Sequence, residues 1–353
     1  MATPNIVPRA DSEGGLGTAS KYWASAYIDA IITTGNITVG GNITATTFNG
    51  IPLYTNDNSI YTHDVSATDS SAVQNAAYGI EAMDAITTGD ANVAIGFKAA
   101  TLLNTGYDNT IVGAYAGDAL TSGNNNVAVG HLALSTEDAH GKNVAIGASA
   151  LQTLNAGADG NNVAVGYLAG SAMTTGTLNT IIGAEAGDAL TSGSRNTALG
   201  YAALSREDAN GFNVAIGYET LKQQNAGADA YNTAVGYQAG KAITTGIKNT
   251  IVGGVAGDAM TTGLNNTLLG YNSGGALVGG SYNVALGYFA LANEDAHGRN
   301  VAIGWRSLQN QNAGADAYNV AIGYDSGLSI STGINNTLIG GHAGDALTTG
   351  DRS

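Results

Sequence analysis

Pairs of acidic residues recur three times along this chain, and a carboxyl pair is the simplest arrangement that could do chemistry. Each pair stands in a Glu-Asp-Ala-His/Asn-Gly segment, and the pairs are Glu137-Asp138, Glu207-Asp208 and Glu294-Asp295. Two carboxyl groups can act as acid and base in glycoside hydrolysis when they lie within about 10 Å across one bond. These pairs are far apart in the chain, and adjacent carboxylates in a turn are usually solvated. We therefore predict no catalytic residue and no enzymatic activity.

Two of these segments also carry a histidine at matched positions, His140 and His297. A trimer axis could gather three copies of either imidazole into a metal site, because histidine nitrogen is a common zinc ligand. Turns of Asp, Asn and Gly could supply oxygen ligands to calcium, but neither a Gly-Gly-x-Gly-x-Asp pattern nor EF-hand spacing occurs. A histidine in an exposed turn is the simpler interpretation, so we predict no metal site and no cofactor.

An aromatic residue or histidine often stands five places after a regularly repeated asparagine. Such a column could stack on sugars, or it could pack between subunits with its hydroxyl groups in water, and we favour packing. The column contains Phe97, His131, Tyr167, Tyr201, Tyr218, Tyr237, Tyr271, Tyr288, Trp305 and Tyr324. The predicted candidate surface or intersubunit contacts are Tyr167, Tyr201, Tyr237, Tyr271, Trp305 and Tyr324.

The asparagine that sets this spacing anchors a repeat running from Asn75 to Asn336. Sixteen anchors follow one another at steps of 17 residues, or 19 at three places, and each has glycine four places on. A fixed period of this length indicates one structural unit stacked on itself. Stacked asparagines can bond side chain to side chain and also satisfy turn backbone groups, so we predict a structural ladder rather than a ligand site. Its predicted members include Asn126, Asn143, Asn162, Asn213, Asn232 and Asn300.

The residues after each anchor predict a short strand with two apolar faces. With the anchor as position zero, positions one and three are mostly Val, Thr, Ile or Leu, and position two is mostly Ala. Both faces should then be buried, one inside a thin coil and the other against a second layer, most simply a neighbouring chain. We expect an all-β protein, a parallel β-roll or β-solenoid of about sixteen 17–19-residue coils, assembled as a homotrimer.

Composition excludes several classes of partner. The 353 residues carry a net charge of −15, which argues against nucleic acid and anionic membranes, since binding to phosphates depends on Lys and Arg. Cysteine is absent, so disulfides and thiolate metal sites are excluded. No stretch has the length of a membrane helix, and residues 1–16 have no signal-peptide pattern. We therefore expect synthesis in the cytoplasm and no membrane insertion.

Three regions follow from these patterns. Residues 1–34 lie outside the repeat and contain Tyr22 and Trp23. Residues 35–74 begin with Thr, Ile and Val alternating between Gly-Asn turns, which predicts a short β shaft followed by a linker. Residues 75–353 form the repetitive β-roll.

The repeat resembles the heads of trimeric autotransporter adhesins. Asn126-Val127-Ala128-Val129-Gly130 is similar to their Asn-Ser-Val-Ala-Ile-Gly motif, and the resemblance covers residues 75–353, although the period here is longer. Those heads are trimers of left-handed parallel β-rolls, so the resemblance implies the same roll here.

The first 50 residues resemble bacteriophage tail fibres more closely. The segment from Leu16 to Trp23 is similar to the Leu-Gly-(small)-(small)-Lys-x-Trp segment near their N-termini. Gly35-Asn36-Ile37-Thr38-Val39 is similar to their Gly-Asn-Leu-Thr-Val shaft repeats. Such fibres are homotrimers that attach to the virion by the N-terminus and meet the host surface distally.

The resemblance implies a tail fibre located in the virion tail, with residues 1–34 as the virion-attachment segment. Its expected partners are two further copies of itself, other tail proteins, and a host surface receptor for which a glycan is one candidate. Two alternatives stay open: a bacterial trimeric surface adhesin and a polysaccharide-degrading tailspike.

Overall fold

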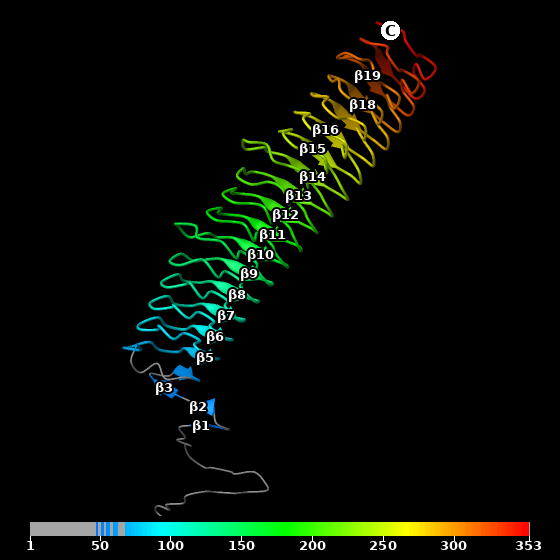
Figure 1. Cartoon of the computed structure of the whole chain (residues 1–353). Helices are drawn as coiled ribbons and strands as arrows, with labels where there is room; N and C mark the ends of the chain where they lie inside the picture. The colour runs from blue at the N-terminus through cyan, green and yellow to red at the C-terminus, as the bar shows by residue number, and fades with distance from the viewer. Residues whose placement is uncertain (1–46, 49–50, 53, 57–58, 63–67, 353) are drawn as a thin grey trace, which may run out of the picture. The chain divides into compact units, whose positions relative to one another are not determined.

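The computed structural model describes most of one compact unit, Thr46–Ser353. The described residues are 47–48, 51–52, 54–56, 59–62 and 68–352 (Figure 1). The predicted N-terminal segment 1–34 and the first part of the predicted shaft, 35–46, lie outside them.

A stack of coils runs from residue 75 to the end of the described chain, and each coil contributes one three-residue strand (Figure 1). The sixteen strands pair in parallel and in register, so that each position lies beside the same position of the next coil; Ala145, for example, is opposite Ala164. Within the described residues there is no helix, and hence none long and apolar enough to cross a membrane. These findings confirm the predicted all-β parallel solenoid of about sixteen coils. The strands are β5 (Ala76–Tyr78), β6 (Val93–Ile95), β7 (Thr110–Val112), β8 (Val127–Val129), β9 (Val144–Ile146), β10 (Val163–Val165), β11 (Thr180–Ile182), β12 (Thr197–Leu199), β13 (Val214–Ile216), β14 (Thr233–Val235), β15 (Thr250–Val252), β16 (Thr267–Leu269), β17 (Val284–Leu286), β18 (Val301–Ile303), β19 (Val320–Ile322) and β20 (Thr337–Ile339).

Four short strands precede the coils: β1 (Thr47–Phe48), β2 (Ile51–Pro52), β3 (Tyr54–Asn56) and β4 (Ser59–Tyr61). β1 pairs with β2 and β3 with β4, both antiparallel, whereas β4 pairs in parallel with β5. The parallel ladder thus begins one rung before the first anchor asparagine. Ser59 occupies the anchor place and accepts the Asn75 N–H at 2.9 Å. The sequence pattern missed this rung because a serine replaces the asparagine.

Backbone hydrogen bonds join each coil to both neighbours, in the turns as well as in the strands. Just after the strand, Gly166 N–H donates to Ile146 O of the preceding coil at 2.8 Å. In the closing turn, Thr174 N–H donates to Thr191 O of the following coil at 2.7 Å. Because most coils repeat this pattern, little of the buried backbone lacks a partner.

Position two of each strand points into the coil, and positions one and three point out. Ala145, Ile181 and Leu268 at position two have no exposed surface. At position three, by contrast, Ile95 is 43% exposed and Ile339 is 69% exposed. One chain therefore buries only one of the two apolar faces. The expected burial of the other face against a sister chain stays a prediction.

The glycine at position four is required by both conformation and space. Gly147 has φ +134°, a value that residues with side chains rarely adopt. A Cβ added there would lie 2.3 Å from the Gly166 carbonyl oxygen of the next coil. Glycine therefore lets successive backbones approach at this corner.

The anchor asparagines form a buried ladder beside the strands. The Asn162 N–H donates to Asn143 Oδ1 at 3.2 Å, and Asn162 Nδ2 donates to Gly176 O at 2.9 Å. The first of these bonds recurs at every step between anchors, including the steps of 19 residues at Asn232 and Asn319. Most of these side chains thus bond both their own turn and the next coil, whereas Asn300 Nδ2 has no hydrogen-bond partner among the described residues. The ladder includes Asn126, Asn143, Asn162, Asn213, Asn232 and Asn300.

Candidate functional site

The glutamates of the three acidic pairs lie in the core and not in a cleft. They occupy position eleven, which is Leu, Ile or Met in eleven of the sixteen coils. Glu137, Glu207 and Glu294 are fully buried at that position, whereas the aspartate after each of them is exposed. Each pair is therefore divided between core and solvent, and its two carboxyl groups do not flank one substrate bond.

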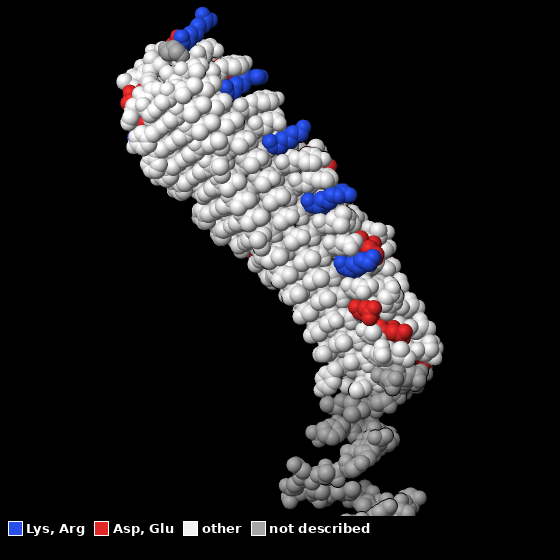
Figure 2. All heavy atoms as spheres, turned by 180° about the vertical axis from the view of Figure 1, so that it is seen from behind, with Lys and Arg blue, Asp and Glu red and all other residues white. Residues whose placement is uncertain are grey.

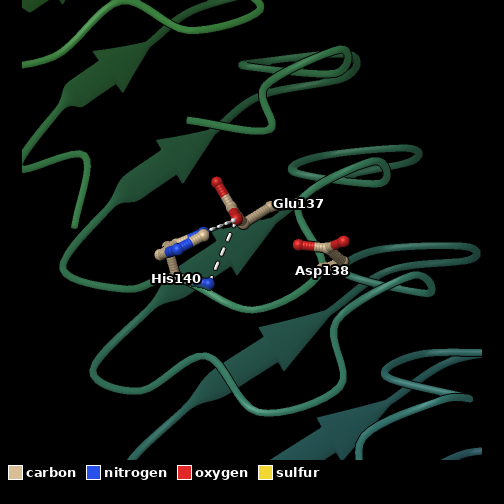
Figure 3. A group of neighbouring side chains, drawn as sticks. All are labelled: Glu137, Asp138 and His140. Carbon is tan, nitrogen blue, oxygen red and sulfur yellow. Dashed lines mark hydrogen bonds and ion pairs between the residues drawn. The ribbon is translucent and has the colours of Figure 1, made fainter. Parts of the chain in front are cut away.

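Glu137 binds the backbone of its own turn and of the next coil. Its Oε1 accepts the His140 N–H at 3.1 Å, and its Oε2 accepts the Ala156 N–H at 3.3 Å. Figure 3 shows the Glu137 carboxylate turned toward His140, with Asp138 standing apart. The buried carboxylate thus caps the turn by accepting hydrogen bonds from backbone N–H groups.

The other two glutamates accept hydrogen bonds from their own turns in the same way, but their Oε2 atoms have no hydrogen-bond partner among the described residues. Glu207 Oε1 accepts both the N–H and the Nδ2 of Asn210, at 3.2 and 3.0 Å, and Glu294 Oε1 accepts the His297 N–H at 3.2 Å. Burial raises the pKa of Glu207 and raises the pKa of Glu294 to about 6, because a carboxylate loses its hydration in the core.

The same turns contain the residues that could hold a metal ion. Ligand atoms of Glu137, Asp138 and His140 lie within 4.8 Å of one another, and the matched residues around Glu294 do the same. Two carboxylates and an imidazole are ligands that zinc accepts. In the third copy, however, Asn210 takes the place of the histidine and bonds Glu207 directly. Because the turn is built the same way with an amide, its geometry does not depend on metal binding.

The aromatic column at position five forms two exposed stacks. Tyr201, Tyr218 and Tyr237 stack with successive ring centroids 5.4 Å apart, and all three are exposed. Tyr288 stacks on Trp305 at 4.2 Å, and Tyr271 stacks on Tyr288 at 5.4 Å. Four predicted contacts therefore fall into the two stacks: Tyr201, Tyr237, Tyr271 and Trp305.

No protein-family model, curated protein or solved structure matches this chain. The likenesses to adhesin heads and to tail fibres therefore stay predictions from short motifs. Function must be inferred from the coils and from the side chains that they present.

The other two predicted contacts lie outside the stacks. Tyr324 meets the His342 ring edge-on at 5.3 Å. Tyr167 is exposed between coils with alanine at position five, and no ring contact to it occurs among the described residues. Gly254 at position five separates the two stacks. The aromatic column is thus interrupted and not continuous.

Stacking determines which part of each ring, its face or its edge, is accessible to a binding partner. Rings stacked face to face cover one another's faces, so edges and hydroxyl groups point outward. Sugars are held by aromatic residues mainly through ring faces, and stacking covers the faces between neighbouring rings of each stack. The stacks are therefore better suited to packing against protein than to a row of sugar sites.

Ion pairs at position six lie next in sequence to the stacked rings and join neighbouring coils. Glu219, next to Tyr218, accepts Lys222 at 2.6 Å, Lys241 at 2.7 Å and Gln238 at 2.8 Å. These donors lower the pKa of Glu219 to about 2. Beside the second stack, Arg306 binds Asp325 through two hydrogen bonds of 2.8 and 2.6 Å.

A second column was missed by the sequence analysis, which counted forward from each asparagine. The residue immediately before the anchor position carries Lys142, Arg195, Lys248, Arg299 and Arg352, five of the chain's 12 basic residues. All five are exposed, and each stands three coils from the next. Figure 2 shows basic side chains in one line along the stack. We call the column of residues before the anchor, from Lys142 to Arg352, the basic stripe.

Proposed function

We propose that this chain is a structural attachment protein of a virion, a bacteriophage tail fibre that holds its binding surface away from the particle. The observation that carries the proposal is the uninterrupted bonding of sixteen coils along one direction. At ~4.8 Å per strand spacing, the coils make a rod of roughly 75 Å. A rod without a break between coils resists bending, which is the mechanical requirement for presenting a surface at a distance.

The exposed outer face of the sheet supports a trimer. Position three places apolar side chains such as Ile95, Leu199 and Ile339 in solvent along the stack. Burying apolar surface is favourable, and copies of the same rod have the same rise per coil, so their faces can match along the whole length. Three chains would also give avidity to weak contacts with a receptor on the host.

The buried glutamates support a non-enzymatic role. Glu137, Glu207 and Glu294 are directed at backbone groups of their own coils and not at solvent, so none is placed to protonate a bound sugar. Virion attachment through residues 1–34, and a glycan as the host receptor, rest on the motif resemblances alone.

Two measurements test the proposal. Light scattering of the purified chain should give three times the 35.2 kDa mass of one copy. Gold-labelled antibody against the coils should decorate the tails of phage particles in electron micrographs. Label on bacterial cells instead would favour a surface adhesin, and release of reducing ends from host polysaccharide would favour a tailspike enzyme.

A further inference from the structure

The basic stripe keeps large side chains where the backbone favours glycine. Along it φ lies between 48° and 64°, the left-handed region, which costs most residues roughly 1–2 kcal/mol. Asparagine tolerates this conformation, and it occupies several rungs, but lysine, arginine, phenylalanine and tyrosine have no such advantage. No glycine occurs at this position in any coil. The backbone conformation therefore does not explain these side chains.

The centre of the stripe is a run of four rungs with a cation at each end. Arg195 and Lys248 enclose Phe212 and Tyr231, whose rings stack at 4.9 Å. The Arg195 guanidinium lies 5.3 Å from the Phe212 ring centroid. Arg195 and Lys248 make no ion pair with any described residue, so their charges face solvent.

Hydrogen bonds keep the rungs in line. Arg195 N–H donates to Thr177 O at 3.1 Å, and Phe212 N–H donates to Ser194 O at 3.2 Å, each joining a stripe residue to the preceding coil. Lys248 N–H donates in the same way to Ala230 O at 2.7 Å. Three rungs at ~4.8 Å each place successive cations roughly 14 Å apart.

The stripe also has cations that are already balanced. Lys142 pairs with Asp159 at 2.5 Å, and Arg299 pairs with Asp316 at 2.8 Å. No described residue pairs with Arg352 in this way. The stripe thus offers single uncompensated charges on an otherwise acidic protein.

We propose that the basic stripe binds a linear polysaccharide with sparse negative charges, one carboxylate at Arg195 and the next at Lys248. Between them, the stacked rings of Phe212 and Tyr231 present their edges, an apolar spacer along which the uncharged sugars can lie without stacking on a ring face. Tyr231 is exposed and can add a hydrogen bond from its hydroxyl group. This inference deepens the attachment role proposed above and rests on it for the place where such a polymer would be met.

Charge spacing distinguishes this partner from nucleic acid. Duplex DNA carries one charge per ~1.7 Å of its axis, far denser than one cation per roughly 14 Å. Most phosphates would remain unpaired against a chain whose net charge is −15. A polymer with widely spaced carboxylates matches the stripe without this repulsion.

Binding of lightly substituted carboxymethyl dextran to the full chain, measured by calorimetry, tests the proposal. The double variant Arg195→Gln, Lys248→Gln should bind at least tenfold more weakly, since each cation near an anionic partner contributes roughly fivefold. The matched control is Arg206→Gln, Lys98→Gln, which removes one arginine and one lysine outside the stripe. The control variant should bind carboxymethyl dextran as tightly as the unmodified chain does. Neutral dextran should bind to neither the unmodified chain nor the control variant.

Four results would overturn the proposal. The first two are unchanged dextran binding in the stripe variant and equally weakened dextran binding in the control variant. The third is tighter binding of a thymidine oligonucleotide than of the dextran to the unmodified chain. The fourth is a fall in the oligomer mass of the stripe variant. The last result would show that the stripe joins copies of the chain. Antibody labelling of particles is a separate measurement, so a failed polymer test leaves the tail-fibre proposal standing. In the same way, failure of the labelling test leaves polymer binding by the stripe standing as a measured property of the chain.

Discussion

Glu294 and Gln311 occupy the same core position in two successive coils. Oε2 of Glu294 and Nε2 of Gln311 are both buried and make no hydrogen bond, although the two groups are chemically complementary. Gln311 instead uses its Oε1 to accept Asn319 Nδ2 of the anchor ladder at 2.7 Å. A polar pair thus interrupts a mostly apolar column, Glu207 and Gln224 repeat the interruption, and Glu137 interrupts the column alone.

The buried glutamate makes this part of the stack sensitive to pH. Burial raises the pKa of Glu294 from 4.5 to about 6, so the folded state holds the proton more tightly than the unfolded state. Its stabilising contribution is complete below about pH 4.5 and is lost as the pH rises through about 6. Hydrogen exchange around residues 294–298 should show the free energy of local opening fall by about 2 kcal/mol over that range.

The variant Glu294→Gln should abolish that pH dependence. The other ionisable side chains of this turn are the exposed Asp295 and His297, whose Nδ1 lies 3.8 Å from Glu294 Oε1. Asp295→Asn and His297→Asn are therefore the controls, and both should keep the fall in stability. If either control removes it while Glu294→Gln does not, the assignment to Glu294 is wrong.

The asparagine ladder should be costly to break. Asn162→Ala leaves the Asn179 N–H and the Gly176 carbonyl without their side-chain partner, and each buried unpaired group costs about 1–3 kcal/mol. We expect a loss of roughly 2–5 kcal/mol in denaturant unfolding. Asn155→Ala, in an exposed turn of the preceding coil, should change stability by less than about 0.5 kcal/mol. Equal effects of the two variants would contradict the ladder's structural role.

Two glycines with positive φ should respond differently to alanine. Gly147→Ala brings a methyl group to 2.3 Å from a backbone carbonyl of the next coil, so the coils must separate. Gly157→Ala places alanine in the milder left-handed region at φ +67°, and nothing lies within 4 Å of the new atom. Limited proteolysis should cut the Gly147 variant within the stack. The Gly157 variant should stay resistant to the protease, because its free energy of unfolding should fall by only about 1 kcal/mol. Resistance of both variants would refute the close approach.

The outer face of the sheet can be tested without disturbing the coil. Leu199→Lys and Leu269→Lys place charges at exposed position three, where a single chain tolerates them. Because a buried unpaired charge is strongly unfavourable at an interface, we expect the oligomer to dissociate while circular dichroism stays β-rich. Thr245→Lys, on an exposed turn, should leave the mass of the oligomer unchanged. An intact oligomer in both leucine variants would exclude this face as the interface.

The period, the glycine corner and the anchor ladder could be predicted because each is a local requirement repeated in every coil. Asn143 and Gly147 reappear in the same roles sixteen times, so pattern alone identifies them. Alternating apolar residues, in contrast, do not say which side of a strand faces inward. Only the closed path of the coil shows that Ala145 is inside and that Ile146 is outside.

The candidate site was harder to predict because its residues differ from coil to coil. Glu137 looked like one half of an exposed acidic pair, and its place in a leucine column becomes evident only when position eleven is compared across coils. The basic stripe was hidden in a similar way, since Arg195 and Lys248 stand three coils apart, whereas the matched turns at Glu137 and Glu207 stand four coils apart. A column whose residue type changes from coil to coil forms no recognisable sequence motif. It becomes visible only when equivalent positions of successive coils are aligned.

The in-register pairing of whole coils has a consequence for length. A coil contacts the one before and the one after it, so removing 17 residues from one anchor to the next rejoins surfaces that already fit. The chain contains such a change in the other direction: the matched turns at Glu137 and Glu207 stand four coils apart, whereas those at Glu207 and Glu294 stand five coils apart and include one more coil, at Asn266. The molecule can therefore act as a ruler whose reach is adjusted in increments of one strand spacing, with no redesign of its ends.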